Sequence, residues 1–454
     1  MDLRIEGGTV VSPQGSRRAD VHIRDGRIAA ITTSDSGEAE RRVDADGLLV
    51  LPGFVDAHVH LMDPGDPERE DWEHGTAAAA ASGVTTVLEH THGAPVLAAD
   101  GLVAKREHVA ARSRVDFGLG AHFFPESIDR VPTLWGEGAV FFKAFTCTTH
   151  GVPGLGEEEL LRAFRAAAAV GAPVLVHCED ESTVDAAEQR LKAEGRADGE
   201  LLPEWRNRTA ERVATERVLR LAGVAGARVV VAHASHPEIL AMIEDARRSG
   251  TRALGETCPQ YLTLLESEVR EHGPLRKFTP PARARTDAEL EEMWDAVCTG
   301  TAVDYISSDH APSTRAQKME GDMWTCHFGL PGLDTTSGIL IDAAVRGTIP
   351  FERLVKLYSE QPARIYGLGP RKGSLSPGSD ADLVLVDPGG SWEVEPAAIR
   401  SKAGWSPYEG RMLKGRVVAT YLRGREVFAN DEVVGEPGGG RPIGGVPNVP
   451  GQDI

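Results

Sequence analysis

Two histidines stand one residue apart at the end of the apolar run LPGFVDAHVHL, residues 51–61. Side chains at positions i and i+2 of a strand project from the same face, so an extended run here would point His58 and His60 at one object. Neutral imidazole is the commonest protein ligand for divalent transition metals, which makes a metal ion the leading candidate. The alternative is a pair of histidines hydrogen-bonded at a strand end, and His-x-His alone does not separate the two.

Four more reactive side chains follow or lie within short apolar runs. Lys143 lies in FFKAF, His177 ends PVLVH, His233 lies in VVVAHA and Asp309 in SSDHAP. Each alone has an ordinary structural explanation, such as a lysine whose stem lies along an apolar surface. Four histidines, a lysine and an aspartate in the same kind of position are harder to explain by packing. Together they predict a metal centre.

The apolar neighbours of Lys143 indicate an unusual amine. Burial lowers the pKa of a lysine because its charged form loses hydration. A neutral amine reacts with carbon dioxide to give a carbamate, an anionic group with two oxygens that can bridge two metal ions. The alternative is that Lys143 is a structural ion-pair partner, which its apolar surroundings disfavour.

The aspartate of SSDHAP fits a catalytic base. Asp309 can bind one metal through one oxygen and face a metal-activated water with the other. It would take the proton of that water and deliver it to the leaving nitrogen. The alternative is an aspartate that caps a turn, which is common.

These residues need elements that bring them together, and the pattern of the chain supplies them. Short runs rich in Val, Ile and Thr alternate with helical stretches such as EEELLRAFRAAAAVG, ATERVLRLAGVAGA, HPEILAMIEDARRSG and DAELEEMWDAVCTG. The strand-like runs cover residues 52–60, 83–90, 114–123, 139–145, 173–178, 228–234, 251–256 and 302–309. Eight strands alternating with helices predict an α/β protein with a (β/α)₈ TIM-like barrel, whose strand ends converge on one mouth.

Both ends of the chain have a different pattern. Alternating runs separated by Asp-Gly and Pro-Gln-Gly are typical of β-hairpins, and they occur in the first 50 residues and again near the C-terminus. We expect the two ends to form one small β-sandwich, from residues 1–51 and 371–434, around a barrel of residues 52–370. The Gly/Pro-rich residues 435–454 predict an arm without regular structure.

Composition narrows the function classes. The chain has 454 residues and a formal net charge of −19, which disfavours nucleic acid and anionic membranes as partners. The five cysteines are scattered without a C-x-x-C pair, as expected of a protein from a reducing compartment. No signal peptide and no long apolar span is visible, so we expect a cytoplasmic protein without membrane contact.

Motifs along nearly the whole chain resemble a cyclic amidohydrolase of the amidohydrolase superfamily, the group of allantoinases, hydantoinases, dihydropyrimidinases and dihydroorotases. The motifs are GLLVLPGFVDAHVHL, GTAAAAASGVTTV, FFKAF, PVLVHCED, VVVAHAS, ETCPQYL, SSDHAP and GSLSPGSDADLVLVD. The resemblance implies a barrel with a small β-sandwich, two zinc ions per chain and a homo-oligomer, a tetramer ahead of a dimer. It also implies carbon dioxide as the reagent that carboxylates the lysine.

The same resemblance implies a role for each reactive residue. The more buried metal is held by His58, His60 and Asp309, the second by His177 and His233, and both by carboxylated Lys143.

The resemblance is less uniform around the substrate. The loop HVHLMDPGDPEREDWEHG is similar to that of allantoinases, whereas ETCPQYL is more like hydantoinases because of Gln260. Thr148 stands where hydantoinases have a tyrosine that polarises the scissile carbonyl, a task that His150 or a metal could take over. KFTPPAR implies a backbone contact to the ring amide at Thr279, and FGLPGLD implies a second one at Phe328 and Gly329.

The sequence therefore predicts a hydrolase with two metal ions that opens a small cyclic amide, with allantoin giving allantoate as the leading reaction. The first alternative is the same chemistry on a hydantoin, a dihydropyrimidine or a cyclic imide. The second is a non-catalytic scaffold with this fold. Such relatives typically lose metal ligands, and this chain keeps all six.

Overall fold

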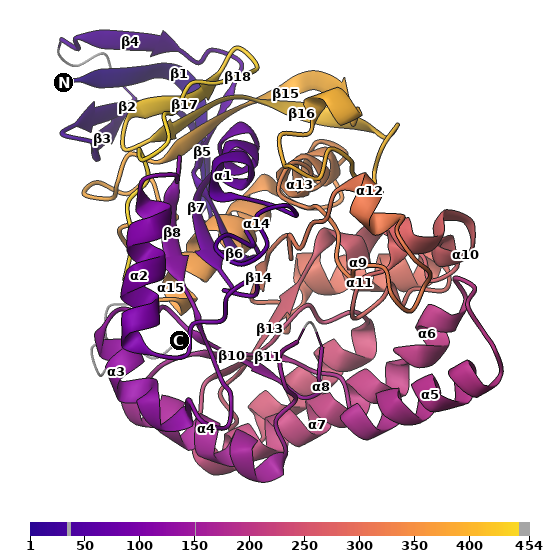
Figure 1. The fold of residues 1–454 in the computed structure, drawn as a ribbon. Coiled ribbons are helices and arrows are strands. Elements are labelled where there is room, and N and C mark those ends of the chain that lie inside the picture. Colours follow the sequence, from indigo (N-terminus) through magenta and orange to yellow (C-terminus); the bar gives the residue numbers. More distant parts are fainter. Residues whose placement is uncertain (34–37, 150, 445–454) are drawn as a thin grey trace.

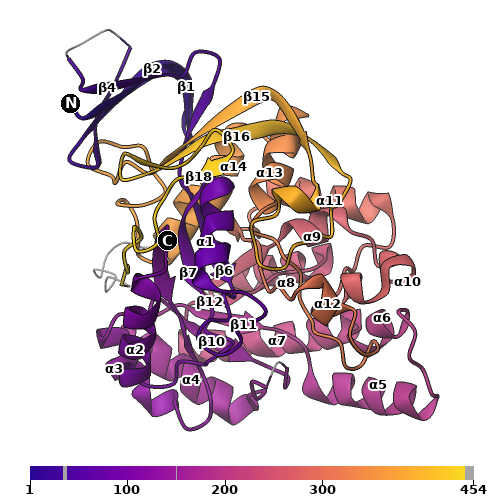
Figure 2. The same cartoon turned by 45° about the horizontal axis from the view of Figure 1, so that its top comes forward.

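The computed structural model of the protein describes residues 1–33, 38–149 and 151–444. A barrel of parallel strands carries helices on its outside, and a mixed sheet built from both ends of the chain lies beside it (Figure 1). The second view shows β1 and β2 from the N-terminal end close to β15 and β16 from the C-terminal end (Figure 2). The predicted fold class is confirmed.

The barrel strands coincide with the predicted runs. They are β6 (Phe54–Val59), β7 (Val84–Glu89), β8 (Asp116–Leu119), β9 (Ala121–His122), β10 (Phe142–Phe145), β11 (Val174–His177), β12 (Val229–Val231), β13 (Ala253–Thr257) and β14 (Tyr305–Ile306). Neighbouring strands pair in parallel in the order β6-β7-β8 and β9 to β14. The ring closes where His60 N donates to His310 O at 2.7 Å and Val59 forms a parallel bridge with His310.

One predicted strand is divided. The run 114–123 is broken at Gly120, so that β8 and β9 together take one place in the ring. A Cβ at Gly120 would lie 2.3 Å from the ring of Phe141, so the close approach of that ring requires glycine. Gly120 N donates to Glu89 O at 2.9 Å and Ala121 N to Phe141 O at 3.0 Å, which keeps the two pieces in register with β7 and β10.

The helices pack around the barrel through apolar stripes. In α4 (Glu157–Val170) the buried residues Leu160, Ala163, Phe164 and Ala167 recur at helical spacing. The four quoted helical stretches are confirmed as α4, α7, α8 and α11. Besides α4, the α-helices are α1 (Trp72–Ala81), α2 (Ala99–Ala110), α3 (Val131–Gly136), α5 (Glu181–Ala193), α6 (Leu201–Trp205), α7 (Arg208–Ala225), α8 (Pro237–Arg248), α9 (Pro259–Thr263), α10 (Glu268–His272), α11 (Asp287–Thr299), α12 (Arg315–Lys318), α13 (Thr336–Val345), α14 (Phe351–Val355) and α15 (Gln361–Ile365). Within the described ranges, no helix is long and apolar enough to cross a bilayer.

The mixed sheet joins the two ends of the chain through one strand, β5 (Leu49–Pro52). This strand pairs in parallel with β1 (Leu3–Ser12) and antiparallel with β15 (Leu383–Glu393). The other strands are β2 (Gly15–Arg24), β3 (Arg27–Thr32), β4 (Arg41–Asp44), β16 (Met412–Leu422), β17 (Arg425–Ala429) and β18 (Glu432–Val433). The predicted Asp-Gly turn between β2 and β3 has positive φ at both Asp25 and Gly26, as a tight hairpin requires.

The Gly/Pro-rich C-terminal segment runs along the barrel where it is described. Phe117 N in β8 donates to Arg441 O at 3.0 Å, and Ile443 N donates to Phe117 O at 2.7 Å. Residues 445–454 of the predicted arm lie outside the described residues.

A buried ionic cluster connects the barrel to the mixed sheet. The ammonium group of Lys372 contacts Asp116 in β8, lies 2.6 Å from Asp382 Oδ2 and 3.0 Å from Asp380 Oδ2. Burial acts to lower the pKa of Lys372, but the three carboxylates raise it, so the amine stays charged. The cation holds together three carboxylates that would otherwise repel one another.

Replacing this cation should destabilise the fold. The substitution Lys372→Met leaves buried carboxylates without their shared partner, which costs about 3–5 kcal/mol and lowers Tm by roughly 3–5 °C in a chain of this size. Thermal unfolding followed by circular dichroism measures the shift. The matched control is Lys414→Met at an exposed position. Equal Tm values for the two variants would contradict the structural role of the cluster.

Candidate active site

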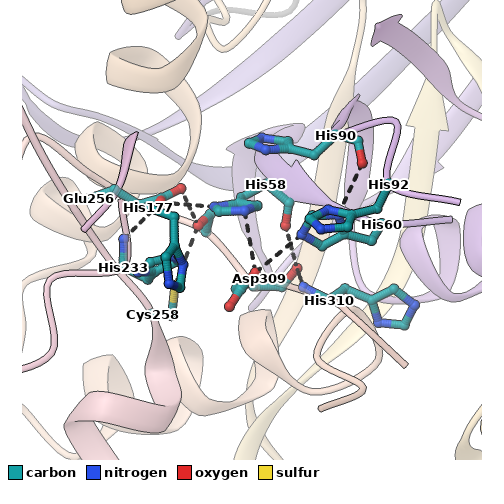
Figure 3. Close-up of polar contacts among 12 residues, drawn as sticks. His58, His60, His90, His92, His177, His233, Glu256, Cys258, Asp309 and His310 are labelled. Carbon is teal, nitrogen blue, oxygen red and sulfur yellow. Dashed lines mark hydrogen bonds and ion pairs between the residues drawn. The ribbon is translucent and has the colours of Figure 1, made fainter. Parts of the chain in front are cut away.

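The six residues predicted to bind metal lie at the carboxyl ends of five barrel strands. His58 is in β6 and His60 directly follows it, Lys143 is in β10, His177 ends β11, His233 lies two residues beyond β12, and Asp309 three residues beyond β14. Five of them, His58, His60, His177, His233 and Asp309, are seen together in the close-up (Figure 3). The structure brings these strand ends together at one mouth of the barrel, as the sequence predicts.

Short distances between side-chain atoms join these residues into one cluster. Asp309 Oδ1 lies 3.3 Å from His58 Nε2 and 3.5 Å from His60 Nε2. His177 Nδ1 lies 3.1 Å from His233 Nε2. Lys143 Nζ lies 3.4 Å from His58 Nε2, and the His58 and His233 rings are 5.7 Å apart between centroids. The lysine therefore lies beside His58, whose ring is a neighbour of His233 in the second group.

Glu256 in β13 fixes the orientation of His58 from behind. Its Oε2 lies 2.9 Å from His58 Nδ1 and also accepts from His233 N at 2.9 Å, while Oε1 accepts from Ser307 Oγ at 2.6 Å. A carboxylate accepts hydrogen bonds, so Nδ1 of His58 carries the proton and Nε2 presents its lone pair toward Asp309. This arrangement suits a metal ligand.

Two more histidines are oriented in the same way. His60 Nδ1 donates to the carbonyl oxygen of His90 at 3.0 Å, which leaves Nε2 as the lone-pair atom on the side of Asp309. His177 Nε2 donates to Glu179 Oε2 at 2.9 Å, which leaves Nδ1 facing His233. The lone pairs are therefore directed at the shared space in both groups, and the donor set fits divalent metal ions.

Burial keeps the imidazoles neutral. It is the largest cause that lowers the pKa of His58, His60, His177 and His233, and the nearby amine of Lys143 adds to it. Burial also lowers the pKa of Lys143 to about 8, a value at which a substantial neutral fraction exists near neutral pH.

Two of these residues have an uncommon backbone conformation. His233 has φ of 38° and Asp309 has φ of 48°, in the left-handed region that non-glycine residues rarely adopt. Such strain persists only where surrounding contacts hold it, and it is concentrated at functional sites. Both residues lie just past a strand end, where the turn directs the side chain back into the mouth.

Sequence reasoning missed a second histidine pair. His90 and His92 follow β7, and the ring of His90 stacks on that of His58 at 3.8 Å between centroids. One ring nitrogen from each of His58, His60 and His90 lies within 4.8 Å of the others. His122, paired with Lys143 across β9 and β10, is also buried. The signal was visible, because EHTH ends a predicted strand with the same His-x-His spacing.

Thr148 contacts Glu181 at the start of α5. It is exposed, and both its backbone N (2.6 Å) and its hydroxyl (3.3 Å) donate to Glu181 Oε2. The alternative donor considered above, His150, lies outside the described residues. The loop after β10 therefore directs Thr148 toward α5.

The other predicted substrate contacts are brought together by Lys277. Gly329 N donates to Lys277 O at 3.1 Å, and the Lys277 ammonium lies 4.2 Å from the ring centroid of the half-buried Phe328. Thr279 follows two residues later, and its hydroxyl donates to Glu179 at 2.6 Å. The loop after β13 and the loop after β14 thus form one packed unit.

Comparisons with known proteins agree with this architecture. Residues 49–427 match the family described as the amidohydrolase family. The chain is 36% identical over 444 residues to an allantoinase of Rubrobacter xylanophilus, covering 96% of each chain. It is 33% identical over 451 residues to an L-hydantoinase of Paenarthrobacter aurescens, covering 97% of each. A solved L-hydantoinase (dihydropyrimidinase) from Arthrobacter aurescens superposes with a TM-score of 0.92 at 31% identity, covering 98% of this chain and 99% of that one.

The fold and the matches define the class of protein as a barrel hydrolase. The chain belongs to the amidohydrolase family, which is metal-dependent. The cluster of candidate ligands at the barrel mouth is consistent with that dependence.

Removing the charge behind His58 should weaken metal binding. In Glu256→Gln a neutral amide oxygen, a weaker acceptor than the carboxylate, holds the proton on Nδ1 of His58 less firmly, so we expect a 10–100-fold lower metal affinity. Competition with a chromogenic chelator measures it. The control is Glu238→Gln at the exposed start of α8. Unchanged affinity in Glu256→Gln would show that Glu256 does not orient the ligand.

Proposed function

We propose that this protein is a hydrolase with two metal ions that opens a cyclic amide, with allantoin to allantoate as the leading reaction. The observation that carries the proposal is the set of oriented lone pairs at the barrel mouth, beside a buried lysine and a carboxylate. Matches over nearly the whole chain to an allantoinase and an L-hydantoinase support the reaction class.

The residues divide into two metal sites. We assign one ion to His58, His60 and Asp309, the other to His177 and His233, and place carboxylated Lys143 between them. Zinc suits this mixture of imidazole and carboxylate ligands. When bound, the ions supply Lewis acidity and a hydroxide nucleophile at neutral pH. The partly neutral amine of Lys143 supports its carboxylation by carbon dioxide.

Asp309 is the proposed base. Its side chain is 13% exposed, more than any of the other five residues, which supports its assignment as the group that faces substrate and water. Its carboxylate accepts the proton of the attacking water and passes it to the ring nitrogen as the carbon–nitrogen bond breaks. The backbone at Thr279 and at Gly329 holds the ring amide by paired donors and acceptors.

Allantoin leads among the possible rings for two reasons. The loop after the first histidine pair is similar to that of allantoinases, and Thr148 replaces the hydantoinase tyrosine with a hydroxyl that is bonded to Glu181. A hydantoin is the second candidate, because of the L-hydantoinase match and of Gln260, which is buried beside Ser308 O. On the family resemblance we also propose a cytoplasmic homo-oligomer, a tetramer ahead of a dimer.

A panel of rings tests the reaction. The zinc-loaded protein should open allantoin with a higher kcat/KM than hydantoin or dihydrouracil, with the ring-opened product identified by mass. Treatment with a chelator should abolish turnover, and zinc should restore it, at about two ions per chain. Absence of stoichiometric metal together with absence of turnover would favour the scaffold alternative, and a faster reaction with hydantoin would replace allantoin as the substrate.

Two variants separate the ligand role from the base role. Lys143→Ala should lose both metal and activity, with partial rescue by added short carboxylates, because it removes the group that joins the two sites. Asp309→Asn should keep much of its metal yet lose about 10²–10⁴-fold in kcat, because an amide cannot accept the proton. Metal analysis and steady-state kinetics on the same samples decide. Near wild-type kcat in Asp309→Asn would refute its assignment as the base.

A further inference from the structure

A single buried carboxylate connects the two halves of the proposed site. Glu179 is fully buried, and its Oε2 accepts from His177 Nε2 at 2.9 Å and from the hydroxyl of Thr279 at 2.6 Å. Arg206 donates to the same oxygen at 3.1 Å, and Arg283 lies 3.5 Å from Oε1. His177 ends β11, whereas Thr279 lies 102 positions further along, in the loop after β13.

Two arginines pair with the buried carboxylate of Glu179. Arg206 Nη1 lies 3.1 Å from its Oε2 and Arg283 Nη2 lies 3.5 Å from its Oε1. An ionised carboxylate can accept from several donors at once, and hydrogen bonds to charged groups are about twice as strong as neutral ones. Glu179 can therefore orient both the imidazole of His177 and the hydroxyl of Thr279.

Glu179 acts on His177 as a hydrogen-bond acceptor and not as a further metal ligand. Cys147, His177 and Glu179 do bring three donor atoms within 4.8 Å of one another. The guanidinium of Arg206 occupies this group, however, because its Nη1 lies 3.3 Å from Cys147 Sγ and 3.1 Å from Glu179 Oε2. A cation already neutralises the site that a metal would need.

We propose that Glu179 is a positioning residue that couples ring binding at Thr279 to metal retention at His177. The inference rests on the proposed function, in which His177 binds a metal and the backbone of Thr279 contacts the ring. Three donors share one oxygen, so removing one of them lets the carboxylate move toward the others and turns the His177 ring. A change at the substrate loop then alters the metal site, although Thr279 itself binds no metal.

The decisive variants are at Thr279, because they leave the buried charges intact. Thr279→Val removes the hydroxyl at nearly constant volume, and Thr279→Ser keeps it as the matched control. In the zinc-loaded full chain, Thr279→Val should raise KM about 10-fold with kcat within about 3-fold, and should release zinc to a chelator about 3–10 times faster. Thr279→Ser keeps the hydroxyl that bonds to Glu179, so it should recover most of the KM and of the zinc retention that Thr279→Val loses.

Glu179→Gln tests the shared carboxylate itself. It should show a larger zinc release rate than Thr279→Val, and the double variant should be no worse than Glu179→Gln alone, because both changes remove the same link. The exposed pair on α5 supplies the control Glu188→Gln. If Glu179→Gln does not fold, the Thr279 pair decides by itself.

The outcomes separate this inference from the function on which it rests. Zinc release from Thr279→Val at the wild-type rate would overturn the coupling, as would equal behaviour of the valine and serine variants. A wild-type protein that holds no zinc and opens no ring would instead overturn the proposed function, before any variant is compared.

Discussion

The site depends on one constraint, which is that its histidines must be buried, neutral and turned the right way. Burial disfavours the protonated imidazole, which cannot bind a metal, and an acceptor behind three of the four rings decides which nitrogen keeps its lone pair. Glu256 does this for His58, the carbonyl of His90 for His60, and Glu179 for His177. The barrel supplies these acceptors from strands and loops that are neighbours only in space.

Much of this arrangement could be predicted from the sequence. The spacing of His58 and His60, the eight strand-like runs and the four quoted helices all correspond to observed elements, because strand and helix periodicity are local properties. The acceptors could not be predicted in the same way. Glu256 lies 198 positions from His58, and nothing within the run TRALGETC shows which of its side chains faces the mouth. The acceptors behind the histidine rings are determined by tertiary contacts, and these cannot be seen in a single sequence.

Around the substrate, too, the sequence shows which residues are present but not which contacts their side chains make. The sequence shows the motif around Thr279, but not the bond of its hydroxyl to Glu179, which lies 100 positions earlier in the chain. The position of Thr148 relative to Lys143 in the sequence likewise does not show that its hydroxyl donates to Glu181 and faces α5. Spacing locates a residue on an element, whereas the direction of a loop side chain follows from what packs against it.

The site lowers the stability of the fold, and this cost argues for a ligand. Two residues are held at positive φ, which costs on the order of 1–3 kcal/mol each. Burial also raises the pKa of Asp309 to about 7 while it lowers that of Lys143 to about 8. The charged form of each group is therefore disfavoured at this place. Packing alone gives no reason to keep such a group together. Divalent cations at the shared space would stabilise the carboxylate and use the lone pairs, and this supports the proposed metal site.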